Sequence, residues 1–269
     1  KHGWSDVVLL ERSDLTSGST WHAAGGMHTI NGDPNVAKLQ QYTIGLYKEI
    51  EELSGQDIGL HMTGGVMLAA TQERFDWLKG VYAKGKYLGM DELEIITPDR
   101  AAELMPLLDP SQFVGALYDP IEGHCDPYGV THAYAKAARM GGADIITHTK
   151  VTATEQRADG SWDITTDKGC IHAEHVVNAA GLWAREVGAM AGLYFPLHPM
   201  EHQYIVTDDV PQIYERDQEH PHVMDPAGES YLRQEGRGLC IGFYEQACKP
   251  WAVKGTPWNF GHELLPDDF

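Results

Sequence analysis

The sequence has few basic residues, few cysteines and no long apolar run. Lys and Arg total 20 against 39 Asp and Glu, which gives a formal net charge of -19. This shortage of positive charge argues against nucleic acid or an anionic membrane surface as a partner. No segment approaches the roughly 20 apolar residues of a membrane-spanning helix, so we expect no membrane span.

Cysteine is also scarce. The four cysteines are Cys125, Cys170, Cys240 and Cys248, and none forms a C-x-x-C pair. We therefore expect reduced thiols and a cytoplasmic location, with the mitochondrial matrix as the alternative. The start "KHGWSD" lacks the apolar stretch of a signal peptide. Because it begins with Lys1 instead of Met, we expect the chain to start inside a longer protein.

Strand and helix signals alternate in two separate blocks, with strand-rich segments between and after them. We expect helices at 34–53, 73–88, 127–140 and 182–192, and a short one after Thr97. We expect strands within 6–11, 64–70, 113–120, 143–148, 150–156, 161–166, 170–181, 202–207, 229–234 and 238–245. The fold class is therefore α/β with mixed character, a Rossmann-like nucleotide-binding layer interleaved with a mixed sheet.

The segment "DVVLLER", residues 6–12, is typical of a buried parallel strand that ends in an acid. A carboxylate at that place suits a ribose hydroxyl pair, although many strands simply end in a charge. The G-x-G-x-x-G turn that precedes such an acid in dinucleotide-binding folds does not occur here. Residues 17–26, "SGSTWHAAGG", follow closely, and their small side chains allow close approach to a ligand around His22.

These two segments, together with "VVNAAGLWAREVG", "PLHPMEHQYIVT" and "SYLRQE", resemble FAD-dependent amine oxidoreductases of the D-amino-acid-oxidase type. Within these, the chain looks most like the dimethylglycine and sarcosine dehydrogenase branch. The resemblance spans most of the chain and implies discontinuous domains. Residues 1–60 and 120–192 would form the FAD-binding domain, and residues 61–119 and 193–269 the substrate-binding domain.

The resemblance also assigns the cofactor site. His22 would carry FAD covalently through a ring nitrogen, and a neutral imidazole suits that reaction. Glu11 and Arg12 would bind the AMP half, and the backbone at Val151 would contact adenine. The turn "NAAG" with Trp183 would pass close to the pyrophosphate, although it could equally be an ordinary strand-end turn. The other cofactor-binding residues expected are Gly18, Ser19, Thr20, Trp21, Ala23, Ala24, Gly25, Gly26, Ala180 and Gly181.

Substrate chemistry is expected in the later sheet. The resemblance points to His202 as the site histidine, which would help to take the proton of the substrate nitrogen. Tyr231 would hold the substrate carboxylate, and structural roles for both residues stay open. His198 and His202 are four residues apart, but Pro196 and Pro199 prevent a regular helix there. We therefore expect no metal site.

The implied reaction is oxidative demethylation of a small N-methylated amino acid, with dimethylglycine as the substrate. Electrons would leave to an acceptor protein or to oxygen, and tetrahydrofolate would bind through a region outside this sequence. The alternatives are a sarcosine-specific dehydrogenase or oxidase and a non-enzymatic regulatory paralogue.

Glycine-rich segments that the family places at both ends of this region would fall outside residues 1–269. The isolated chain would then hold FAD weakly, with His22 on an open, solvent-facing groove and Glu11 at its edge.

Overall fold

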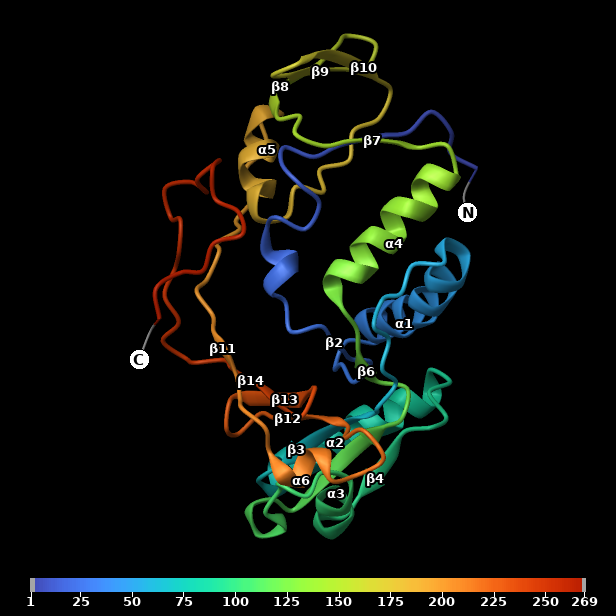
Figure 1. The fold of residues 1–269 in the computed structure, drawn as a ribbon, viewed down its shortest axis with the longest axis vertical. Coiled ribbons are helices and arrows are strands. Elements are labelled where there is room, and N and C mark those ends of the chain that lie inside the picture. Colours follow the sequence, from blue (N-terminus) through green and yellow to red (C-terminus); the bar gives the residue numbers. More distant parts are fainter. Residues whose placement is uncertain (1–2, 268–269) are drawn as a thin grey trace.

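A computed structural model describes residues 3–267 (Figure 1). The strands are β1 (Val8–Leu10), β2 (Gly26–Met27), β3 (Gly65–Ala69), β4 (Glu94–Ile96), β5 (Gly115–Asp119), β6 (Gly123–His124), β7 (Asp144–Ile146), β8 (Val151–Gln156), β9 (Trp162–Thr166), β10 (Gly169–Ala173), β11 (Tyr204–Val206), β12 (His222–Asp225), β13 (Ser230–Glu235) and β14 (Gly238–Phe243). The helices are α1 (Pro34–Ser54), α2 (Gln72–Tyr87), α3 (Pro98–Leu104), α4 (Pro127–Met140), α5 (Ala184–Met190) and α6 (Pro211–Tyr214), with 3₁₀ turns η1 (Ser19–His22), η2 (Pro110–Gln112) and η3 (Gly181–Trp183).

The principal sheet has seven strands in the order β11-β14-β13-β12-β3-β5-β4. All pairings within it are antiparallel except β12 with β3, which are parallel. Two buried apolar clusters pack on this sheet, one including Val66 and Ala116 and the other including Met67 and Leu117. Successive residues of β3 therefore serve opposite faces of the sheet, as strand geometry requires. The helices α2, α3 and α6 lie against this sheet at the lower end of the molecule in Figure 1.

The other end of the molecule carries small sheets. β1 pairs in parallel with β7, and β8, β9 and β10 form an antiparallel sheet beside α5 (Figure 1). Between the two ends lie α1 and α4, which share a buried cluster including Ile44 and Val130. Here β2 pairs with β6 and brings residues 26–27 beside residues 123–124.

The helix starts follow their capping signals. The side chain of Asp126 accepts hydrogen bonds from the N–H groups of Tyr128 and Gly129, and Pro127 occupies the first turn of α4. Thr97 caps α3 in the same way through Arg100 N–H. These side chains satisfy backbone donors that the first helical turn leaves free, which is why the sequence predicts these starts well.

Two strand expectations are wrong in part. The strand expected to continue to residue 181 ends at Ala173, and Val176 and Val177 are 41% and 82% exposed. Among residues 3–267 no strand pairs with that segment, so its backbone has no ladder to join. β1 is parallel as expected, but it is not buried, because Val8 is 37% and Leu9 is 45% exposed. Among the described residues β1 pairs only with β7, so it is not enclosed within a larger parallel sheet.

Candidate flavin and substrate site

The glycine-containing segment 17–26 forms η1 and then enters β2. Gly25 has φ +76, and a Cβ there would lie 2.1 Å from the carbonyl oxygen of Cys125. Only glycine fits such a position without strain. The Cys125 N–H also donates to the Gly25 carbonyl at 3.0 Å. The segment that bears His22 is thus anchored tightly to the start of α4.

Gly18 and Trp183, both expected at the cofactor, lie together. A Cβ at Gly18 would sit 3.1 Å from Cζ3 of the Trp183 indole, which is 7% exposed. Ala180 and Gly181 form the turn before Trp183, and the Asn178 side chain accepts a hydrogen bond from Ala180 N–H. Segments about 160 residues apart in sequence therefore meet at this point.

Glu11 and Val151 also come near one another. The Glu11 carbonyl accepts a hydrogen bond from Thr149 N–H at 2.8 Å, two residues before Val151 begins β8. The Glu11 carboxylate accepts from Ser13 N–H at 2.8 Å. The backbone expected to contact adenine thus lies beside the acid expected to bind the ribose.

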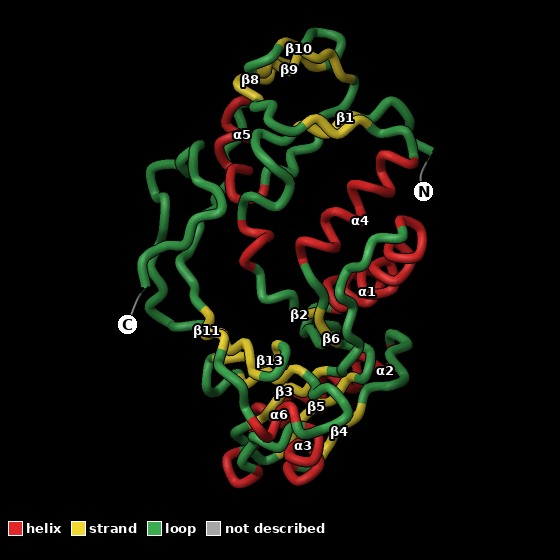
Figure 2. Tube along the Cα trace, viewed as in Figure 1, coloured by secondary structure: helices red, strands yellow, loops and turns green. Residues whose placement is uncertain are grey.

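The Arg12 guanidinium is held by the chain between β14 and the C-terminus, which runs as a long loop (Figure 2). It donates to the carbonyls of Trp258 at 2.8 Å and Phe260 at 2.5 Å. Its Cζ lies 3.8 Å from the centroid of the Trp183 ring. Arg12 therefore joins the first segment of the chain to the last described one.

The two expected substrate residues are brought together by a third residue that sequence reasoning missed. Tyr244 lies 5.7 Å from the His202 ring and 5.6 Å from the Tyr231 ring, measured between centroids. His202 Nδ1 is 3.6 Å from a carboxylate oxygen of Glu245. Burial raises the pKa of Tyr231 to about 12, and nearby Cys240 adds to this. Tyr231 is therefore a neutral hydrogen-bond donor at ordinary pH.

Arg233 is a second residue that sequence reasoning missed, although it lies within "SYLRQE". It stands two residues from Tyr231 in β13, so both side chains leave the same face of the strand. Its Nε donates to the carbonyl of Ala24 at 2.6 Å, and its Nη2 lies 2.6 Å from Glu235. One arginine therefore fastens the His22 segment to the sheet that carries Tyr231.

Buried polar atoms around η1 fit a group that would bind there. The Nε2 of His22, the Nε1 of Trp21 and the Oγ1 of Thr16 are buried without a hydrogen-bond partner in the described chain. Burial lowers the pKa of His22, and neighbouring His262 lowers it further. The neutral ring keeps a free lone pair, as attachment through a nitrogen requires. The expectation that His22 lies on an open, solvent-facing groove is wrong for Nε2, because that atom is buried. The His22 ring packs against the Trp21 indole, with centroids 4.6 Å apart.

Comparison with known proteins shows the class to which this chain belongs. Residues 1–267 match the family described as FAD dependent oxidoreductase, so the chain belongs to that family. The family expected from the sequence motifs is confirmed.

Several proteins of known name are similar to this chain in sequence. The mitochondrial dimethylglycine dehydrogenase of Rattus norvegicus is 42% identical over 273 residues, covering 100% of this chain and 32% of the relative. The mitochondrial sarcosine dehydrogenase of Homo sapiens is 35% identical, covering 97% of this chain and 28% of the relative. The mitochondrial pyruvate dehydrogenase phosphatase regulatory subunit of Mus musculus is 35% identical, covering 95% and 29%. The chain thus spans about a third of the length of these relatives.

The solved structure of L-proline dehydrogenase from P. horikoshii has a TM-score of 0.79 and 29% identity, covering 88% of this chain and 62% of that chain. This similarity and the mixed sheets confirm the expected α/β fold class. Within residues 3–267, no helix is both long and apolar enough to cross a membrane.

Proposed function

We propose that this chain is the flavin-binding and substrate-binding part of a dehydrogenase that demethylates an N-methylated glycine, with dimethylglycine as the substrate. One observation carries the proposal. His22 has a buried, unpartnered ring nitrogen on a glycine-containing segment that Arg233 fastens to the strand of Tyr231. The 42% identity with a dimethylglycine dehydrogenase supports the choice of substrate.

The proposed domains follow the sequence blocks given above, with 1–60 and 120–192 for FAD and 61–119 and 193–269 for substrate. The strand pairings support this division, since all seven strands of the principal sheet lie within 65–119 and 204–243. FAD would be held by His22, by Glu11 and Arg12 at the AMP half, and by the turn before Trp183.

When bound, FAD supplies an acceptor for the hydride that leaves the N-methyl carbon. His202, beside Glu245, would take the proton of the substrate nitrogen and keep its lone pair available. Tyr231 would donate a hydrogen bond to the substrate carboxylate, which its raised pKa permits. The product iminium would be hydrolysed or passed to tetrahydrofolate bound outside this chain, with an acceptor protein or oxygen receiving the electrons.

Because both dehydrogenase relatives are named as mitochondrial, we favour the mitochondrial matrix over the cytoplasm as the location of this protein.

The test uses the complete protein, purified with FAD and precipitated with acid. Flavin should stay with the pellet and appear by mass spectrometry on the peptide that contains His22. His22→Ala should release it to the supernatant, whereas the control His172→Ala, on exposed β10, should retain it. Dimethylglycine should reduce the flavin faster than sarcosine, and betaine should not reduce it. Failure of both dimethylglycine and sarcosine to reduce the flavin would reject the substrate class.

A regulatory paralogue is the second candidate, because a phosphatase regulatory subunit is 35% identical over 95% of the chain. A sarcosine-specific dehydrogenase or oxidase is the alternative within the enzyme class. Flavin that is bound but reduced by no N-methylated amine would favour the regulatory paralogue. Preferential reduction by sarcosine would favour the sarcosine-specific enzyme.

A further inference from the structure

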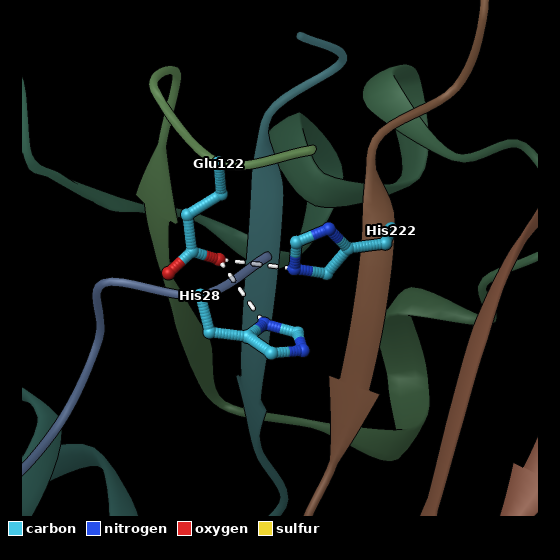
Figure 3. A group of neighbouring side chains, drawn as sticks. All are labelled: His28, Glu122 and His222. Carbon is cyan, nitrogen blue, oxygen red and sulfur yellow. Dashed lines mark hydrogen bonds and ion pairs between the residues drawn. The ribbon is translucent and has the colours of Figure 1, made fainter. Parts of the chain in front are cut away.

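Three residues far apart in sequence converge between the His22 segment and the principal sheet. His28 follows β2, Glu122 precedes β6, and His222 is the first residue of β12. Figure 3 shows both imidazole rings turned toward one carboxylate oxygen of Glu122. The ligand atoms His28 Nδ1, Glu122 Oε2 and His222 Nε2 all lie within 4.8 Å of one another.

The backbone makes room for this group at Gly65. His222 pairs in register with Gly65 across β12 and β3. A Cβ on Gly65 would lie 2.0 Å from Glu122 Oε2 and 2.5 Å from His222 Nε2. Any other residue would fill the place where the polar atoms meet, so the glycine is part of the arrangement.

The carboxylate of Glu122 is fixed from its other side. Its Oε1 accepts hydrogen bonds from the N–H groups of Thr29 at 2.5 Å and Ile30 at 2.9 Å. This leaves Oε2 directed at the two histidines. Such hydrogen bonds to the second oxygen orient a carboxylate that binds a metal ion.

The distances between the ligand atoms suit a small divalent ion. Glu122 Oε2 lies 3.0 Å from His222 Nε2 and 3.6 Å from His28 Nδ1. A tetrahedral zinc ion, with bonds of about 2.0–2.1 Å, separates its ligand atoms by about 3.4 Å. The two observed distances fall on either side of that value. The longer one exceeds a hydrogen bond, and His28 Nδ1 is buried without a hydrogen-bond partner in the described chain.

The charge states also suit zinc. Burial acts to raise the pKa of Glu122, but His222 and His28 outweigh it and hold the carboxyl ionised. Burial lowers the pKa of His222, so that ring is neutral. One carboxylate with two imidazoles is a common zinc ligand set.

We propose that His28, Glu122 and His222 form a binding site for a zinc-like divalent transition-metal ion. The side chains of Glu122 and His222 are 2% and 4% exposed, whereas that of His28 is 29% exposed. His28 is thus the most exposed of the three ligands, although its Nδ1 is buried. The ion ties the segment after β2 to the sheet at β12, and this inference does not depend on the proposed reaction.

A second group of possible ligands provides a comparison within the same protein. His61, His124 and Glu219 also lie within 4.8 Å of one another. However, the side chains of His61 and Glu219 are 44% and 43% exposed, and the two form an ion pair at 2.8 Å. An exposed ion pair has less geometric restraint than the buried group, so we place the site at His28.

The experiment uses the complete protein, stripped with a chelator and then titrated with Zn²⁺ and separately with Co²⁺. We expect one equivalent of tight Zn²⁺ by elemental mass spectrometry and a tetrahedral Co²⁺ absorption band. His28→Gln should weaken Zn²⁺ binding at least 100-fold and remove the band while leaving the fold intact, because His28 is the most exposed ligand. Circular dichroism checks the fold, and His222→Gln is a second, more disruptive variant.

Substitutions of histidines outside the proposed site distinguish Zn²⁺ binding at this site from non-specific Zn²⁺ binding. His172→Gln changes an exposed histidine that lies 3.3 Å from Asp163, and it should leave Zn²⁺ binding unchanged. His61→Gln should also leave the tight equivalent intact. The proposal is overturned if no stoichiometric ion binds, if folded His28→Gln binds as tightly as wild type, or if His61→Gln removes the tight equivalent.

Discussion

The guanidinium of Arg12 stacks on the indole of Trp183, with Cζ 3.8 Å from the ring centroid. The same guanidinium donates to two carbonyls of the segment 258–260. Trp183 Nε1 in turn donates to the carbonyl of Pro257 at 3.1 Å. This pair therefore holds three distant segments of the chain together at the proposed AMP end of the cofactor site.

Arg12→Lys should release the segment 257–262. A lysine keeps the charge but has neither the planar fork that reaches both carbonyls nor the flat face that stacks on indole. We expect the free energy of unfolding to fall by about 1–3 kcal/mol, with faster hydrogen exchange and proteolysis in 257–262. Arg100→Lys, at an exposed pair with Glu103 in α3, is the control and should cost less than about 0.5 kcal/mol. Equal effects of the two substitutions on stability would contradict the proposed role of Arg12 in holding the segment 257–262.

Gly25→Ala should be among the most damaging single-methyl additions in the chain. The new Cβ would lie 2.1 Å from the Cys125 carbonyl at a φ of +76, so both contact and conformation are unfavourable. We expect a loss of about 3 kcal/mol or more in thermal unfolding. Gly45→Ala adds the same methyl in α1 with no atom within 4 Å, and should stabilise by about 0.5–1 kcal/mol. A tolerated Gly25→Ala would show that the segment rearranges freely.

The sequence predicts the parts of this molecule that depend on neighbouring residues. Asp126 and Pro127 mark the start of α4 because capping acts over three residues. The motif histidine His22 could be proposed as a cofactor residue because its segment is continuous in sequence. Arg233 lies within the motif "SYLRQE", but the sequence could not assign it a role. Its hydrogen-bond partner Ala24 is 209 residues away in sequence. The pairing of β12 with β3 is equally non-local, so neither Gly65 nor His222 could be linked to Glu122.

Val176 and Val177 show why an apolar run alone does not make a strand. The pattern "HVVN" favours a buried strand, but a strand also needs a neighbour that pairs with its backbone, and none among residues 3–267 does so. Local patterns supply the side-chain alternation, while the partner is a property of the whole fold.

Glu186 should make the protein sensitive to acid. Burial acts to raise its pKa, but hydrogen bonds from Thr256 N–H and the Arg185 guanidinium outweigh this and lower it below the usual value. A lowered pKa in the folded state gives stability that is present above the unfolded pKa of about 4.5 and is lost as pH falls through the folded pKa. The unfolding free energy of Glu186→Gln should therefore depend less on pH between about 5 and 3. Parallel pH curves for the two proteins, by urea unfolding, would contradict this role.

Tyr231 should remain protonated well into alkaline conditions, because burial raises its pKa to about 12 beside Cys240 and Tyr244. Gly242 explains the burial, since the Tyr231 ring occupies the space that a Cβ at position 242 would fill, 2.2 Å from Cζ. The stabilisation linked to the neutral phenol is fully present below the unfolded pKa of about 10 and is lost as pH rises through 12.

Ultraviolet titration of folded Tyr231→Phe should therefore lack one phenol ionisation near pH 12 that wild type shows. The variant should also lose less stability between pH 10 and 12. Tyr87→Phe, which removes a 91% exposed phenol, is the control and should retain the late ionisation. In the proposed reaction, Tyr231→Phe should keep the same dependence of rate on pH below pH 10 as wild type. The reason is that the Tyr231 phenol stays neutral over that range. If wild type shows a pH dependence below pH 10 that Tyr231→Phe lacks, then Tyr231 ionises during turnover and does not act as the neutral donor.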